Sequence, residues 1–227
     1  GVTAVNYVAT DNAGNSALCT FSVTVVDNQN PTVTCPANIS VNTTPSLCSA
    51  VVTYTVGVSD NCPSPVLSMT AGLASGSTFP KGATLNTFKV TDAAGNTSAS
   101  CSFSVTVTDA ENPTVSCPSN IAVNTAAGQC SAIVTYAIGT GDNCVGQSSS
   151  QSAGLASGAT FPKGITVNTF MATDASGNTS APCSFTVTVT DNQAPTIVSC
   201  PANTTISTGV GTCDNTYSWS APTVLDN

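Results

Sequence analysis

The sequence has 227 residues, a formal net charge of −8, three basic residues and no histidine. So few cations leave no basic surface for nucleic acid or for an anionic membrane, and no apolar run approaches the ~20 residues of a membrane helix. Without imidazole there is no Ser-His-Asp triad, Cys-His pair or His-ligated zinc, so we expect no enzyme activity.

The chain contains 11 cysteines. This number is too high for a reducing compartment unless the thiols bind metal, and the short CxxC spacing of metal sites is absent. The sequence therefore predicts an oxidised protein located outside the cell or on its surface. An odd number of cysteines leaves at least one thiol without a partner in an isolated molecule.

An 82-residue repeat organises the chain. Residues 27–108 align with residues 109–190 without a gap, and 53 of the 82 aligned positions are identical. Residues 1–26 match the last third of the repeat, and residues 191–227 match its beginning. We predict two complete domains between two partial ones, and we expect the 227 residues to be a window from a longer repetitive chain.

Each repeat has the sequence pattern of β-structure. Its apolar segments are rich in β-branched and aromatic residues, some alternate with period two, and Gly, Pro, Asn, Asp and Ser clusters separate them. In residues 92–96, Asp92 and Gly95 suit a tight hairpin turn. The strands expected in the first complete repeat are 32–42, 49–56, 65–70, 76–79, 83–91 and 99–108.

Five motifs occur in the same order in both complete repeats. They are Cys-Pro-x-Asn-Ile-x-Val (35–41 and 117–123), Ser/Gly-Asp-Asn-Cys (59–62 and 141–144), Ser-Gly-x-Thr-Phe-Pro-x-Gly (75–82 and 157–164), Thr-Asp-x-x-Gly-Asn (91–96 and 173–178) and Cys-Ser-Phe-x-Val-Thr-Val (101–107 and 183–189). Together they resemble the hyalin repeat, or HYR domain. The resemblance implies an all-β fold of tandem immunoglobulin-like β-sandwich modules arranged end to end, used on extracellular proteins for adhesion and as spacers, without catalytic residues.

Each complete repeat has four cysteines, and sequence alone allows three ways of pairing them. In a sandwich of the implied kind the first and last strands are neighbours, which favours the bonds Cys35–Cys101 and Cys117–Cys183. Members of the family with only two cysteines keep these positions. The other four cysteines expected in disulfides are Cys48, Cys62, Cys130 and Cys144.

The partner of Cys48 stays open. A bond to Cys62 requires residues 57–62 to fold back, because 14 extended residues span about 46 Å while the Cα atoms of a disulfide lie within ~7 Å. The alternative is a bond from Cys48 to Cys144 of the next module. Pairing within each repeat leaves three cysteines of the partial repeats over, namely Cys19, Cys200 and Cys213.

Most of the acidic residues recur at equivalent positions of the repeat, in the linkers and in two loops. In the implied topology these positions share one end of a module, where carboxylates, amides and carbonyls would offer the six to eight oxygens that Ca²⁺ takes. Alternatively, each aspartate caps its own turn. The candidate Ca²⁺ ligands are Asp27, Asp60, Asp92, Asp109, Asp142, Asp174, Asp191 and Asp226.

These features predict a structural segment of a long extracellular filament or adhesin stalk. Its partners would be further repeats of the same chain, or other copies that complete the partial repeats by adding strands. One alternative is an adhesin that binds a glycan or protein through variable loops, because residues 63–70 and 145–152 are the most divergent stretch between the repeats. Another is a cell-surface spacer stiffened by Ca²⁺.

Overall fold

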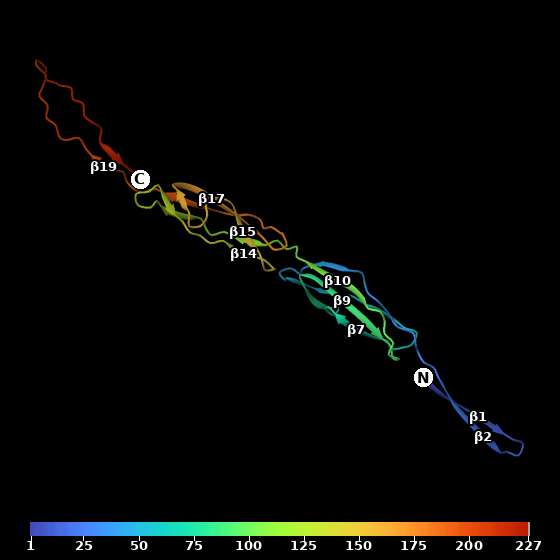
Figure 1. The fold of residues 1–227 in the computed structure, drawn as a ribbon. Coiled ribbons are helices and arrows are strands. Elements are labelled where there is room, and N and C mark those ends of the chain that lie inside the picture. The colour runs from blue at the N-terminus through green and yellow to red at the C-terminus, as the bar shows by residue number, and fades with distance from the viewer. Residues whose placement is uncertain (227) are drawn as a thin grey trace. The chain divides into compact units, whose positions relative to one another are not determined.

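The computed structural model describes residues 1–226, which divide after Ala110 into two units. Unit 1 begins at Gly1 and unit 2 at Glu111. The described residues form 20 β-strands and no α-helix, so the chain is all-β (Figure 1). Among residues 1–226 there is no helix long and apolar enough to span a membrane.

Unit 1 begins with a β-hairpin. Strand β1 (Val2–Thr10) pairs antiparallel with β2 (Ser16–Thr24) along its whole length. The Asp11 carboxylate closes the turn between them by accepting the backbone N–H groups of Ala13 and Asn15, both at 2.9 Å. This Asx-type turn is the local reason for the hairpin.

A β-sandwich follows the hairpin in unit 1. One layer is a four-stranded sheet in the order β4-β10-β9-β7, and the other consists of the pairs β3-β6 and β5-β8. The strands are β3 (Thr32–Thr34), β4 (Ile39–Asn42), β5 (Ser49–Val52), β6 (Gly57–Ser59), β7 (Val66–Ala71), β8 (Ser77–Pro80), β9 (Gly82–Thr91) and β10 (Cys101–Thr108).

The core of this sandwich follows the period-two pattern of its strands. Phe103, Val105 and Val107 alternate along β10 and are each at most 2% exposed. Phe79 on β8 packs in the same cluster from the other layer. Because burying a side chain of this size contributes about 1.5–3 kcal/mol, these residues account for much of the stability of the module.

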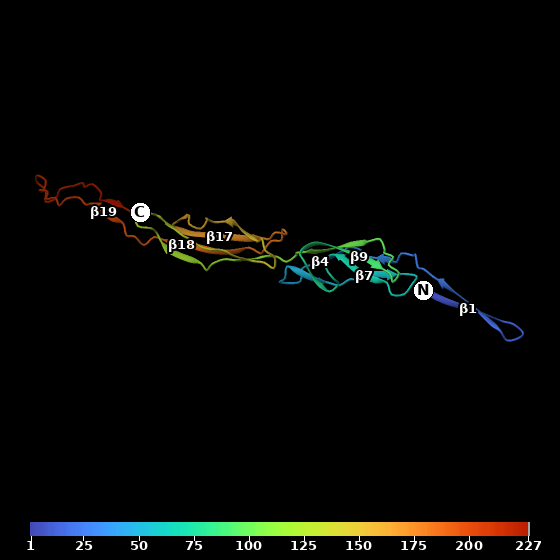
Figure 2. The ribbon, with the colours of Figure 1, turned by 60° about the horizontal axis from the view of Figure 1, so that its bottom comes forward.

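Unit 2 repeats the sandwich with the same topology. Its sheet has the order β12-β18-β17-β15, and the pairs β11-β14 and β13-β16 form the other layer. Figure 2 labels the two central strands of the sheet, β17 and β18. A short pair, β19 (Thr196–Ser199) with β20 (Thr223–Leu225), follows it. The sandwich strands are β11 (Thr114–Ser116), β12 (Ile121–Asn124), β13 (Ser131–Ile133), β14 (Gly139–Gly141), β15 (Ser148–Ala153), β16 (Thr160–Pro162), β17 (Gly164–Thr173) and β18 (Cys183–Thr190).

The first strand differs from the expected single strand over residues 32–42. It is divided into β3, which pairs antiparallel with β6, and β4, which pairs parallel with β10. Pro36 lies between them and has no N–H to donate to a ladder, so the chain changes layers there. The strand expected over residues 49–56 is also shorter, because β5 ends at Val52.

Candidate functional site

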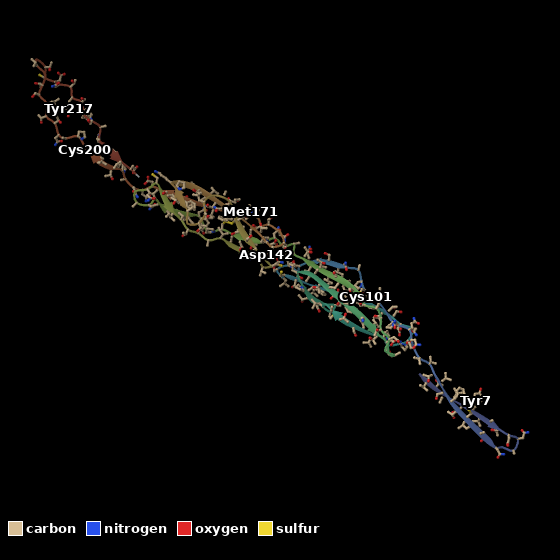
Figure 3. All side chains as sticks on the ribbon, in the orientation of Figure 1. Tyr7, Cys101, Asp142, Met171, Cys200 and Tyr217 are labelled. Carbon is tan, nitrogen blue, oxygen red and sulfur yellow. A yellow bond between two sulfur atoms is a disulfide. The ribbon has the colours of Figure 1, made fainter. Side chains whose placement is uncertain are left out.

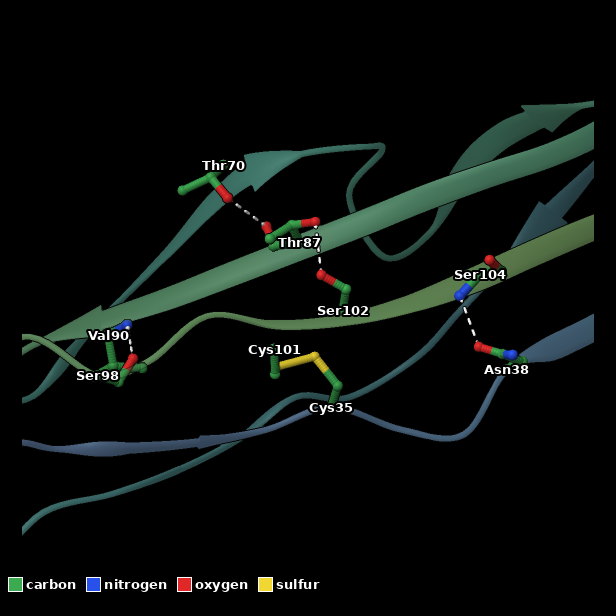
Figure 4. Close-up of a disulfide and its surroundings, with 9 residues drawn as sticks. All are labelled: Cys35, Asn38, Thr70, Thr87, Val90, Ser98, Cys101, Ser102 and Ser104. Carbon is green, nitrogen blue, oxygen red and sulfur yellow. Dashed lines mark hydrogen bonds between the residues drawn. A yellow bond between two sulfur atoms is a disulfide. The ribbon is translucent and has the colours of Figure 1, made fainter.

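A disulfide joins the first and last strands of each sandwich. Cys35 follows β3 and bonds to Cys101, the first residue of β10, with a Cα separation of 5.8 Å (Figure 4). Close to the bond, the Asn38 side chain accepts the backbone N–H of Ser104 at 2.9 Å. Cys117 and Cys183 form the same bond in unit 2. Both bonds are those expected for neighbouring first and last strands.

The bond from Cys48 to Cys62 is not formed, because Cys62 is a free thiol. The necessary fold-back does not occur. Strand β5, directly after Cys48, pairs with β8, whereas residues 57–59 pair with β3 in another ladder. The equivalent bond in unit 2 is absent for the same reason, since Cys130 is also a free thiol.

Three further cysteines are free and exposed, and they are those left over by the repeat pattern. Cys19 lies on β2, and Cys200 and Cys213 lie beyond the second sandwich; Figure 3 labels Cys200. Cys19 and Cys200 occupy the positions of the bonded Cys101 and Cys117, and Cys213 occupies the position of Cys130.

Three carboxylates meet in unit 1, from the linker before β3, the loop after β6 and the turn after β9. Asp27, Asp60 and Asp92 each present an oxygen within 4.8 Å of the others. The sequence assigned the three residues to one end of the module, and the structure brings them together there. We call these three residues the acidic cluster.

Each member of the acidic cluster also holds its own loop. Asp92 accepts the N–H groups of Ala94 (2.9 Å) and Asn96 (2.8 Å), and its second oxygen accepts the Asn96 side chain at 2.7 Å. Asp60 accepts the N–H of Cys62 at 3.2 Å. The turn-capping role that the sequence allows is therefore present.

Two buried oxygens of the acidic cluster remain without a hydrogen-bond partner, Asp27 Oδ2 and Asp60 Oδ1. The backbone N–H of Gln29 is the main cause of a lowered pKa at Asp27, with Cys62 and Asn61 contributing, so Asp27 is ionised at neutral pH. Neighbouring carboxylates repel one another, and a hard divalent cation relieves that repulsion while accepting unpartnered oxygens. The donor set therefore fits Ca²⁺.

The equivalent loops of unit 2 have the same local geometry. Asp142, labelled in Figure 3, accepts the N–H of Cys144 at 3.3 Å, and its Oδ1 is likewise buried without a partner. Asp174 accepts the N–H groups of Ser176 and Asn178, both at 2.8 Å. The two loops are therefore built alike in both complete repeats.

The linker aspartates have a second role, as partners of lysine. Lys81 lies 3.4 Å from the fully buried carboxylate of Asp109, and Lys163 lies 3.0 Å from Asp191. Neither ion pair was predicted from the sequence, which offered both aspartates as Ca²⁺ ligands or as turn caps. The signal in the sequence was the recurring spacing, because each lysine precedes its aspartate by 28 residues in both repeats.

Asp226, the last aspartate of the candidate set, is exposed and directly follows β20. It lines a cavity of about 240 Å³ together with Gly128, Gln193 and Leu225. A larger cavity, of about 500 Å³, adjoins the acidic cluster of unit 1 and is lined in part by Asp27.

The most divergent stretch of the repeat forms an edge strand of the four-stranded sheet. In unit 1 this strand, β7, exposes Val66, Leu67 and Met69. The equivalent strand β15 exposes serine and glutamine instead. The sequence difference therefore lies on a solvent-facing strand and leaves the core unchanged.

Comparisons with known proteins agree on one family. The family model described as HYR domain matches residues 1–25, 26–107 and 108–189. Hyalin of Strongylocentrotus purpuratus is 36% identical over the whole chain, which covers 19% of that protein. Hyalin of Lytechinus variegatus is 31% identical, with 43% of that protein covered. The chain thus spans less than half the length of these relatives.

Solved structures of cadherin repeats resemble the chain distantly. The extracellular domains 1–5 of protocadherin gamma B2 match with a TM-score of 0.39 and 14% identity, over 85% of this chain and 46% of that one. Human protocadherin-24 EC1-2 matches with a TM-score of 0.33 and 16% identity, over 73% of this chain and all of the other.

Proposed function

The chain belongs to the HYR domain family, and we propose that it is a non-catalytic structural segment of a long extracellular filament or adhesin stalk. The observation that carries this proposal is the disulfide between the first and last strands, which recurs in both complete modules. Its place in the fold determines how each module responds to tension.

Tension applied along the chain enters a module through its linker and reaches Cys35 at the end of β3. From there the disulfide leads directly to Cys101, and β10 continues into the next linker at Asp109. The two cysteines are separated by 66 residues in the sequence, and the segment between them forms most of the sandwich. This segment therefore lies outside the covalent path that carries the load. A module built in this way transmits force without unravelling.

An extracellular location is part of the same proposal. Disulfides persist in oxidising compartments, and small sandwiches with few charges depend on them. The expected partners are further repeats of the same chain or other copies of it.

Immunogold electron microscopy of intact, non-permeabilised cells tests this location and role. An antibody raised against the two complete repeats should label fibrous or stalk-like material outside the cell. Labelling that appears only after permeabilisation would contradict the proposal.

A second candidate function is a spacer stiffened by Ca²⁺. The acidic cluster supports it, because Asp27 and Asp60 each keep a buried oxygen without a partner beside a third carboxylate. When bound, Ca²⁺ would supply positive charge, and Asp27, Asp60 and Asp92 would hold the linker and two loops around it. The ion would thereby tie the start of the repeat to its own sandwich.

Thermal unfolding with and without Ca²⁺ tests this candidate. Added Ca²⁺ should raise the melting temperature, and Asp60→Asn should reduce that increase, whereas the exposed control Asp214→Asn should leave it unchanged. Identical melting curves in EDTA and in millimolar Ca²⁺ would eliminate the metal while leaving the structural role intact.

A further inference from the structure

The thiols of Cys62 and Cys130 belong to two different positions of the repeat. The position directly before β5 and β13 in the two complete repeats is here called position B. It is occupied by Cys48 and Cys130, and Cys213 occupies the equivalent position in the last, partial repeat. Cys62 and Cys144 occupy the Asp-Asn-Cys loop, here called position C. Within residues 1–226, the free thiol is at position C in unit 1 and at position B in unit 2.

Position B lies at the end of the module from which the next repeat begins. In unit 2 the backbone N–H of Lys163 donates to the carbonyl of Cys130 at 2.9 Å. The ammonium group of the same lysine contacts Asp191, the first residue of the following repeat, at 3.0 Å. Unit 1 repeats the arrangement, since the N–H of Lys81 donates to the carbonyl of Cys48 at 3.2 Å and its ammonium group contacts Asp109.

The following linker is clamped onto the loop that leads to position B. Gln193 accepts the N–H of Gly128 at 3.1 Å and donates to the carbonyl of Ala126 at 3.2 Å. Asp226 adjoins this loop, because it shares the 240 Å³ cavity with Gly128. Asp226 occupies the position of Asp60 in the repeat that begins at Asp191.

Position C lies at the opposite end of its module, beside the linker that precedes it. The side chain of Asn61 donates to Asp27 at 3.3 Å, and the thiol of Cys62 contacts the same carboxylate. The 500 Å³ cavity opens at Cys62, lined also by Val26 and Asp27. Within unit 1, the residues before Asp27 form the β1-β2 hairpin.

Both positions therefore approach the aspartate that begins a repeat, position B from the preceding module and position C from the module that follows. We propose that successive repeats are joined by a disulfide from position B of one repeat to position C of the next. In this chain the rule gives the bond Cys48–Cys144. It assigns Cys62 to a cysteine of a preceding repeat and Cys130 to a cysteine of a following one.

This bond adds to the proposed structural role. It rests on that proposal in one respect, because it requires an oxidising compartment. Combined with the bonds within modules, it gives a covalently continuous ladder in which every joint has a bridge in addition to its linker. A joint restrained at two points resists bending and twisting more than a single peptide linker does. The ladder would thus stiffen the segment as well as strengthen it.

A small-molecule disulfide such as oxidised glutathione is the oxidant that the step requires. One protein thiolate attacks a glutathione sulfur, forms a mixed disulfide and releases one glutathione thiol. The second protein thiolate then attacks the protein sulfur of the mixed disulfide and releases the second glutathione thiol. Two protein thiols are oxidised, one glutathione disulfide is reduced, and the two protons pass to the released thiols.

Cys130, at position B of unit 2, is exposed and can meet the oxidant directly. We therefore expect an exposed thiol at position B to react first.

Disulfide mapping of the whole chain tests the proposal. The protein is oxidised in a glutathione buffer, its monomeric fraction is isolated, free thiols are alkylated, and the chain is cleaved before aspartate. This digestion places Cys48 in peptide 27–59, Cys62 in 60–91 and Cys144 in 142–173. Peptide 27–59 also contains Cys35, so we expect it to be linked to 92–108 through Cys35 and to 142–173 through Cys48. Peptide 60–91 should be released with an alkylated cysteine.

Two results would overturn the proposal: a link between peptides 27–59 and 60–91, or release of 142–173 with an alkylated Cys144. The variant Cys144→Ser should leave one additional alkylated thiol in 27–59. Cys130→Ser is the matched control and should change no link. The Cys35–Cys101 link in the same map reports on the bond that supports the proposed function, so the two can fail separately.

Discussion

The side chain of Asn86 is completely buried in the first sandwich, and its oxygen accepts the backbone N–H of Leu73 at 2.8 Å. This hydrogen bond joins the middle of β9 to the turn between β7 and β8. Asn168 and Leu155 repeat it at 2.8 Å in the second sandwich. A buried polar side chain thus fixes one turn in each module.

Replacing Asn86 with leucine removes the acceptor and leaves the partly buried N–H of Leu73 without it. An unsatisfied buried donor costs about 1–3 kcal/mol, so we expect urea to unfold the first module at a clearly lower concentration. Asn42→Leu, at an exposed position of β4, is the control and should change little. An unchanged unfolding midpoint for Asn86→Leu would show that the bond is not stabilising.

Two glycines near this turn separate backbone strain from steric clash. Gly72 and Gly76 both have positive φ angles, of 96° and 84°. A Cβ on Gly72 would lie 2.1 Å from the Asn86 oxygen, whereas a Cβ on Gly76 would meet nothing within 4 Å. We expect Gly76→Ala to cost about 1–2 kcal/mol from the backbone conformation alone.

Gly72→Ala should cost substantially more than Gly76→Ala in the same urea titration, because it must also displace the Asn86 side chain. Equal destabilisation by the two substitutions would contradict the close approach of Gly72 to Asn86.

Loss of the first disulfide should destabilise mainly the first module. The bond closes a loop with a sequence separation of 66 residues, for which chain entropy predicts about 4 kcal/mol. In a calorimetric scan, Cys35→Ser should therefore move one unfolding transition to a lower temperature and leave the transition of the second module in place. Cys19→Ser, at an exposed free thiol, serves as the control and should not shift either transition.

The titration of Asp27 gives a pH-dependent prediction. Its pKa in the folded protein is lower than the ordinary value of 3.8, mainly because it accepts the N–H of Gln29. A lowered folded-state pKa means that the unfolded chain binds the proton more tightly. The contribution of Asp27 to stability is therefore present above pH 3.8 and is lost as the pH falls through the lower, folded-state value.

Carboxyl titration by NMR measures this pKa directly. Asn61→Ala removes the side-chain hydrogen bond at 3.3 Å and should raise the pKa of Asp27. It should not move Asp11, whose lowered pKa depends first on Asn15. A midpoint for Asp27 at or above 3.8 in the unmodified chain would be inconsistent with the geometry described.

The all-β fold could be predicted from patterns local to each segment, and the end of the module that holds the acidic cluster could be predicted from the topology that the family resemblance implies. Alternation marked β10, and the Asp92 to Asn96 motif marked its hairpin turn. The division of the first strand was missed although Pro36 signalled it. Its cause is the exchange of pairing partners between layers, which is a property of the tertiary structure.

The buried role of Asn86 and the clamp formed by Gln193 could not be predicted in the same way. Asn86 is in phase with the buried Phe88 and Val90 along β9, so alternation marks its face as inward, but no local pattern identifies the turn that its side chain supports. Gln193 contacts Gly128 across 65 residues, and no local pattern reports a contact at that range.

Stretching single molecules from their two ends, under oxidising and then reducing conditions, tests the load-bearing claim most directly. The account predicts that each oxidised module withholds the residues between its first and last cysteines, a separation of 66 residues. Reduction should therefore release roughly 220 Å of additional extended chain per module. Equal extension under both conditions would contradict the claim that the disulfides carry the load past the sandwiches.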